Sequence, residues 1–323
     1  MLIKEKIKQR FPSLTRYYYF LSNRERRVSY GNDNPDKVFY VYGVPDTVGG
    51  LWWHINKVLM HLGYAKDNGY IPVVDMQNYE SQYLCKEELG KTNVWEVFFK
   101  QPAGYSLEDI KNSKNIILGR KLPYPRLEYY MGQSPFYENE DRIKYFHNLF
   151  QEYIVFNDRT TNYLDELHNT MFGDKGRIVG VLCRGTDYMQ KKPRNHPVQP
   201  NPLDVIRDTK EVMNKYNCDY VFVATEDADI LDVFKNEFGR RLLYIEQTRL
   251  RKQDITKNDY LSSAFMRLNQ SNDIFHRCID YLSATFLLSK CNCYIAGRTG
   301  GSKGVLIMSN GFEFKKIYDL GLY

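Results

Sequence analysis

Short runs of β-branched and aromatic residues alternate along the chain with longer segments whose apolar residues recur at helical spacing. A strand, a helix and a second strand in this order form the unit from which parallel sheets are built. The first half of the chain therefore predicts such a unit, followed by a further strand and a long amphipathic helical region. The predicted strands are 38–42, 71–75 and 115–118, and the predicted helices are 52–68, one near Leu107, and 135–172.

The second half repeats the alternation more regularly. The predicted strands are 178–183, 220–224, 241–245 and 292–296, and the predicted helices are 202–216, 228–238, 273–290 and 303–309. Gly173-Asp-Lys-Gly176 interrupts the pattern between the two halves. The sequence thus predicts an α/β fold with two Rossmann-like domains that face a central cleft. The predicted bounds are a basic arm at 1–36, an N-terminal domain at 37–174 and a C-terminal domain at 175–323.

Composition fits two globular domains in the cytoplasm. The chain has 323 residues, of which 43% are apolar and 26% charged, so it is neither disordered nor too short for two cores. No apolar run approaches the roughly 18 to 20 residues that span a bilayer, and the amino terminus lacks the apolar segment of a secretory signal. The six cysteines lie mostly in apolar runs, as free buried thiols do.

The net charge of +6 is concentrated near the amino terminus. Between Lys4 and Arg27, lysines and arginines are interleaved with aromatic residues and leucines. Charge of this kind most often marks a solvated, partly disordered arm. The alternative is an arm that lies on an anionic membrane surface, which would place the protein peripherally on the cytoplasmic face of the inner membrane. Nucleic acid is not expected as a partner, because no helix-turn-helix, zinc-finger or stacking-sheet signature accompanies the charge.

Polar residues follow three strands of the second half at the point where each strand ends. Arg184, Thr225 and Arg298 stand there, and parallel strands present their carboxyl ends at one edge, where open α/β sheets bind ligands. A buried arginine is costly unless it meets an anion, and a diphosphate matches the planar fork of donors of Arg184. The alternative is a structural ion pair between Arg184 and Asp187. Glu226 follows Thr225 and joins the candidate set.

The turn after the last predicted strand, residues 297–302, is the second candidate phosphate site. It contains Thr299, Gly300, Gly301 and Ser302 and leads into a helix, so its backbone N–H groups and hydroxyls are suited to an anion. A flexible turn is the alternative. The segment approaches a Walker A pattern but departs from it at two positions, so an ATPase is not favoured.

Residue types that hold metals are sparse. Asp227 and Asp229 form an acidic pair, but they precede a predicted helix, where carboxylates cap helix amino termini. His196 lies in a polar, Pro-bounded loop near the predicted cleft, where it is placed to meet a substrate. No metal and no resident cofactor are predicted.

Several segments together resemble the superfamily of α-1,2, α-1,6 and protein O-fucosyltransferases. Residues 179–188 resemble its His-x-Arg-Arg-x-Asp segment, and 220–227 and 287–302 are similar to its following motifs. Residues 49–51 and 65–75 look like its front glycine loop, helix and second strand. The resemblance implies the two-domain GT-B fold and metal-independent, inverting transfer from a nucleotide sugar, usually GDP-fucose.

The resemblance also implies residue roles. Arg184 matches the arginine that binds the donor's β-phosphate, and Thr299, Gly300 and Ser302 match the loop opposite it. Asp187 is the nearest carboxylate to this site and is the candidate catalytic base. The full donor-binding set is Arg184, Thr225, Glu226, Asp280, Arg298, Thr299, Gly300, Gly301 and Ser302.

The chain departs from the superfamily pattern where its members contact guanine. Leu182 stands in place of the motif histidine and Gly185 in place of the second arginine. Ala284 occupies the position of an expected aspartate, and Asp280 lies one helical turn earlier. The base of the donor is therefore left open.

The acceptor-side candidates surround the front loop. They are Gly49, Gly50, Trp52, Trp53, His54, Asn56 and His196. Either His54 or Asn56 would replace the asparagine usual in the front loop of the superfamily. Trp52 and Trp53 are suited to stacking on a sugar ring and equally to packing in the core.

The sequence favours a transferase that moves fucose from GDP-fucose to a glycan or a lipid-linked oligosaccharide in surface polysaccharide synthesis. Two alternatives remain on the same fold: a transferase that uses a different nucleotide sugar, and a non-catalytic protein that binds a nucleotide sugar or a glycan. An adaptor that acts through the basic arm is a third.

Overall fold

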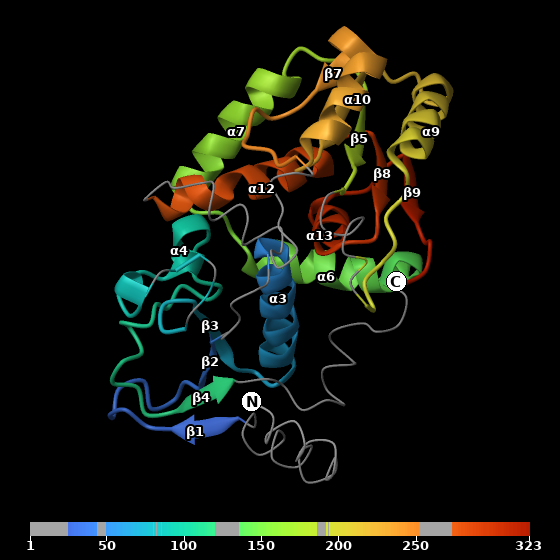
Figure 1. Ribbon diagram of the computed structural model, residues 1–323. Coiled ribbons are helices and arrows are strands. Elements are labelled where there is room, and N and C mark those ends of the chain that lie inside the picture. Colours follow the sequence, from blue (N-terminus) through green and yellow to red (C-terminus); the bar gives the residue numbers. More distant parts are fainter. Residues whose placement is uncertain are drawn as a thin grey trace, which may run out of the picture.

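The computed structural model contains two β-sheets with a layer of helices between them (Figure 1). It describes residues 25–43, 50–79, 81, 83–84, 86–119, 136–185, 192, 194–251 and 273–323. In the part of the chain thus described, the sheets have four and five strands. The α/β class predicted from the sequence is confirmed, and the strands that form the centre of each sheet run parallel.

The first sheet comes from the first half of the chain. Its strands are β1 (Arg26–Val28), β2 (Phe39–Gly43), β3 (Ile71–Asp75) and β4 (Ile116–Gly119), in the order β1-β4-β2-β3. Three of them are the strands expected from the sequence, and they pair parallel. The edge strand β1 pairs antiparallel with β4 and lies inside the range predicted as the basic arm.

The second sheet is fully parallel. Its strands are β5 (Ile178–Leu182), β6 (Tyr220–Ala224), β7 (Leu242–Leu243), β8 (Cys293–Gly297) and β9 (Phe314–Tyr318), in the order β7-β6-β5-β8-β9. β9 was not expected from the sequence, because two lysines interrupt its apolar residues as they do on many edge strands. β5 is central and buried on both faces, as its apolar sequence predicts.

The helices largely follow the sequence periodicity. They are α3 (Leu51–Asp67), α4 (Val94–Phe98), α6 (Glu140–Tyr153), α7 (Asp158–Phe172), α9 (Pro202–Lys215), α10 (Ala228–Phe238), α12 (Ile274–Ser289) and α13 (Gly300–Met308), with 3-10 turns η1 (Lys86–Glu88), η2 (Phe136–Glu138) and η3 (Gly239–Arg241). The helical region predicted at 135–172 is divided, because the Asn157 side chain accepts a hydrogen bond from the Thr160 N–H and starts α7 anew.

The helix predicted near Leu107 is wrong. Residues 107–112 form turns. The Asp109 carboxylate accepts hydrogen bonds from the backbone N–H and the hydroxyl of Ser106, at 2.7 Å each, and this local turn replaces a helix. The helix that precedes β4 is instead the short α4, which Asn93 caps.

The central layer of helices joins the two halves through one continuous apolar core. α3 packs against α6 and α13, and α12 packs against α4 and α7 (Figure 1). Trp52 is at the centre of this layer: it is 1% exposed, and its indole Nε1–H donates to the Thr285 hydroxyl of α12 at 2.8 Å. A Cβ at Gly304 of α13 would lie 2.3 Å from the Trp52 ring, so glycine is required there.

Candidate active site

The carboxyl ends of β5, β6 and β8 meet at one edge of the second sheet. Leu182 lies beside Ala224 on one side and beside Ala296 on the other. Neighbouring strands are about 4.8 Å apart, so the residues that follow these pairs start from adjacent positions. The backbones at Arg184, Thr225 and Arg298 are therefore brought to the same edge, as the sequence indicates.

Arg184 is paired on the β6 side of this edge. Its Nε lies 3.7 Å from the Glu226 Oε1, and the two side chains are 22% and 15% exposed. This contact holds the guanidinium near the carboxyl edge of the sheet. Because both side chains are mostly buried there, solvent screens their charges less than at the surface. Asp187, the partner considered from the sequence and the candidate base, lies outside the described residues.

The residues after β6 stabilise their own turn. The Asp227 side chain accepts from the N–H groups of Asp229 and Ile230 at 2.9 and 3.1 Å, so the capping interpretation is confirmed. The Thr225 hydroxyl accepts from the Asp227 N–H at 3.2 Å. Thr225 is thus buried in the turn, and Glu226 is the side chain of this strand end that reaches Arg184.

An arginine that sequence reasoning did not assign a role supports the same strand end. Arg249 donates to the carbonyl of Thr225 at 3.2 Å and to that of Ile245 at 2.6 Å. Burial lowers the pKa of Arg249 and raises the pKa of Asp280 on α12, while each charge favours the ionised form of the other. Asp280, a predicted donor-binding residue, therefore lies near Arg249 in a partly dry environment.

The glycine turn is built as a helix cap. The Thr299 hydroxyl accepts from the Ser302 N–H at 3.0 Å, and the Ser302 hydroxyl accepts from the Thr299 N–H at 2.8 Å. Both predicted hydroxyl donors thus serve the start of α13. The backbone N–H groups of Gly300 and Gly301 are left as the groups that an anion would meet at this helix terminus.

Tyr137 of η2 joins the first half of the chain to this cap. Its hydroxyl donates to the Thr299 carbonyl at 2.8 Å and accepts from the Thr299 N–H at 3.1 Å. It also lies 3.0 Å from the Ser302 hydroxyl. Sequence reasoning missed Tyr137, because 162 positions separate it from Thr299 and no motif marks it.

Arg298 is directed toward the opposite side from Arg184. Its guanidinium pairs with Glu138 of η2 and lies 3.0 Å from the Asp319 carboxylate just after β9. The Arg298 carbonyl accepts from the Gln199 side chain at 3.1 Å. The structure therefore brings the backbones of Arg184 and Arg298 together and holds their side chains in separate ion pairs.

The front-loop candidates are divided between core and surface. Trp52 and His54 are buried, whereas Trp53 is 46% exposed with the Lys57 ammonium 4.5 Å from its ring. Asn56 is half-buried on α3. Gly50 starts α3, its carbonyl accepting the first helical hydrogen bonds, and Gly49 lies outside the described residues.

His196 lies in an exposed loop that pairs with the carboxyl terminus. Its carbonyl accepts from the Tyr323 N–H at 3.0 Å, and its ring nitrogen Nδ1 lies 3.1 Å from the Arg194 carbonyl. This places His196 on the β9 side of the sheet, away from the Arg184–Glu226 pair. It stays a proposed acceptor-side residue.

Replacement of Tyr137 by Phe tests the contact between the two halves. We expect Tyr137→Phe to lower the free energy of unfolding by about 1–2 kcal/mol, because the Thr299 carbonyl and N–H lose a buried partner. Urea unfolding measures this. Tyr30→Phe, at a residue 55% exposed, is the control and should change little. Equal stability of the two variants would contradict the assigned contact.

The fold is that of known fucosyltransferases. POFUT1 in complex with GDP-fucose superposes with a TM-score of 0.53 at 9% identity, over 87% of this chain and 97% of that one. NodZ α-1,6-fucosyltransferase co-crystallised with GDP gives 0.50 at 14% identity, over 84% and 93%. The GT-B fold implied by the sequence motifs is thus supported by structures. No family model and no curated protein matches the sequence.

Within the described ranges, no three His, Cys, Asp or Glu side chains are grouped to hold a metal ion. In the same ranges, no helix has the length and apolarity required to cross a bilayer.

Proposed function

We propose that this protein is an inverting glycosyltransferase that uses a nucleotide sugar, GDP-fucose foremost, without a resident metal or cofactor. The observation that carries the proposal is the position of Arg184. It stands at the carboxyl end of the central parallel strand, next to the start of α13, in a fold shared with structures that contain GDP or GDP-fucose. Open α/β sheets bind nucleotides at this edge.

The chemistry follows from the leaving group. Cleavage of the sugar–phosphate bond leaves the growing negative charge on the nucleoside diphosphate. A fixed guanidinium and the first N–H groups of a helix stabilise that charge without reorganisation, and they do so more strongly in a partly dry site. Arg184 and the N–H groups of Gly300 and Gly301 would carry this role. Glu226 would hold the guanidinium in position.

The acceptor side is proposed on sequence grounds. A glycan or lipid-linked oligosaccharide hydroxyl would attack the sugar, and Asp187 would take its proton. Gly49, Gly50 and Trp53 would line the approach. We extend the proposal to surface polysaccharide synthesis in the cytoplasm, with the basic arm 1–36 on an anionic membrane and the donor and acceptor domains divided at residue 175.

A panel of GDP-, UDP- and CMP-sugars, with and without EDTA, tests the proposal. We expect hydrolysis of one donor at a rate that EDTA does not change. Thermal stabilisation by a donor without hydrolysis would favour a non-catalytic binding protein. A chain whose melting temperature responds to no nucleotide would contradict both.

A further inference from the structure

The amino end of α13 is weak as a helix. Gly300, Gly301 and Gly304 are three of its first five residues. After proline, glycine is the least favourable residue in a helix, because it loses the most conformational freedom when the backbone is fixed. The cap formed by Thr299 and Ser302 offsets part of this loss. The direction of the first N–H groups of α13 therefore depends on contacts from outside the helix as well.

The peptide group between Thr299 and Gly300 carries one of the two N–H groups proposed to meet the donor. A trans peptide is planar, and its C=O and N–H point in opposite directions. Contacts that hold the Thr299 carbonyl therefore set the direction of the Gly300 N–H. The carbonyl accepts from the Lys303 N–H at 3.2 Å and from the Ser302 hydroxyl at 3.0 Å, both inside α13. The Tyr137 hydroxyl donates to it from another element, at 2.8 Å.

The preceding peptide group, between Arg298 and Thr299, is held from two sides. Its carbonyl accepts from the Gln199 side chain at 3.1 Å, and its N–H donates to the Tyr137 oxygen at 3.1 Å. Tyr137 thus contacts both peptide groups that flank Thr299. A hydrogen bond accepted by a carbonyl also polarises the peptide, which strengthens the N–H on its other side as a donor.

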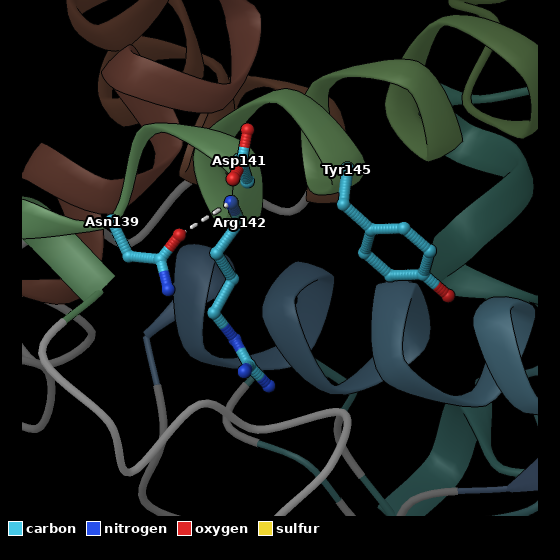
Figure 2. A pocket seen from close by; sticks show the side chains of 4 residues that line it. All are labelled: Asn139, Asp141, Arg142 and Tyr145. Carbon is cyan, nitrogen blue, oxygen red and sulfur yellow. Dashed lines mark hydrogen bonds between the residues drawn. The ribbon is translucent and has the colours of Figure 1, made fainter.

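The position of Tyr137 is set by the start of α6. Asn139 follows η2 directly, and its side-chain oxygen accepts from the Arg142 N–H at 3.0 Å, which caps α6 (Figure 2). α6 in turn packs against α13. A helix from the first half of the chain therefore holds η2, and with it Tyr137, next to the glycine turn.

Two cations, one in the glycine turn and one just after it, pack on the aromatic rings of η2. The Arg298 guanidinium lies 5.3 Å from the centre of the Tyr137 ring and binds the Glu138 carboxylate. The Lys303 ammonium lies 5.3 Å from the centre of the Phe136 ring. These contacts come before and after the two peptide groups along the chain, so they keep the Tyr137 hydroxyl close to the turn.

We propose that Tyr137 is a positioning residue whose hydroxyl directs the Gly300 N–H at an oxygen of the donor diphosphate. This inference rests on the proposed function and deepens it. Tyr137 would act through the turn and not on the donor itself, because its hydroxyl is bonded to Thr299. The first half of the chain would thereby contribute to diphosphate binding without contacting the diphosphate.

Calorimetric titrations of the full chain with GDP and with guanosine test the proposal. Tyr137→Phe removes one oxygen and keeps the ring between Phe136 and Arg298. We expect the ratio of GDP affinity to guanosine affinity to fall at least about fivefold, as the loss of one hydrogen bond gives, with guanosine affinity unchanged. The kcat of donor hydrolysis should fall at least as much, because the charge on the diphosphate grows as the bond breaks.

His147→Phe is the matched control. The His147 Nδ1 lies 2.9 Å from the Ile307 carbonyl, so this variant removes a contact between α6 and the opposite end of α13. It should lower the melting temperature about as much as Tyr137→Phe does and leave the affinity ratio within about twofold. A Tyr137→Phe protein that loses stability but keeps the wild-type ratio and kcat would show that Tyr137 only packs, and would overturn the proposal.

The wild-type chain separates this inference from the proposed function. Wild-type protein that binds GDP no more tightly than guanosine would overturn the proposed function, and the positioning role with it. A wild-type preference for GDP that Tyr137→Phe retains in full would overturn the positioning role alone and leave the proposed function standing.

Discussion

Arg184→Ala should reduce kcat/KM for the nucleotide sugar several hundredfold. In the proposed mechanism the guanidinium would stand beside the departing diphosphate, and one charged donor at such a position contributes on the order of 3–4 kcal/mol to transition-state stabilisation. The loss should be greater in kcat than in KM, because the charge on the diphosphate grows as the bond breaks. Initial rates of donor hydrolysis and of transfer measure both constants.

Arg177→Ala is the matched control for this prediction. Arg177 precedes the same strand at its amino end, where it donates to the Tyr216 carbonyl and pairs with Glu313. Its replacement removes the same charge from the opposite edge of the sheet and should leave kcat/KM within about threefold. An Arg184→Ala enzyme as active as Arg177→Ala would remove Arg184 from the mechanism.

Trp52→Ala should lower the free energy of unfolding by about 3–5 kcal/mol, the usual cost of emptying a buried tryptophan site. The indole is buried among α3, α12 and α13, and its Nε1–H binds Thr285. The cavity would open against Gly304, which has no side chain to fill it. Urea unfolding measures the change.

The neighbouring tryptophan provides the control. Trp53 is 46% exposed, and Trp53→Ala should cost within about 0.5 kcal/mol, as most surface substitutions do. Trp52→Phe should lie between the two, because it keeps most of the packing and loses the hydrogen bond to Thr285. Equal stabilities of Trp52→Ala and Trp53→Ala would show that the two halves do not share a core at this point.

Local pattern predicted most of the fold. The spacing of the apolar residues and the positions of the turn residues predicted β5, β6 and α10 to within one or two residues of their observed ends. Because parallel strands present their carboxyl ends at one edge of a sheet, the sequence alone predicted that Arg184 and Arg298 follow strands that end at the same edge. The sequence-based assignment failed where the decisive contact was short-range and polar, as in the turn that Asp109 forms near Leu107.

The site was less predictable because its contacts come from distant segments. Tyr137, Arg249 and Lys303 carry no motif, and their roles depend on which strand ends or helices they approach in space. Trp52 illustrates the same limit. The sequence was equally consistent with stacking on a sugar ring and with packing in the core. The burial of Trp52 against α13 shows that it packs in the core.

The central claim is that the carboxyl edge of the second sheet binds the diphosphate of a nucleotide through Arg184. Calorimetric titrations of the wild-type chain with GDP and with guanosine, both in EDTA, measure what the diphosphate adds to affinity. We expect GDP to bind at least about a hundredfold more tightly than guanosine, as two charged hydrogen bonds would give, and Arg184→Ala to abolish most of that difference. Equal affinities for GDP and guanosine in the wild-type chain, or an unchanged difference in Arg184→Ala, would contradict the account.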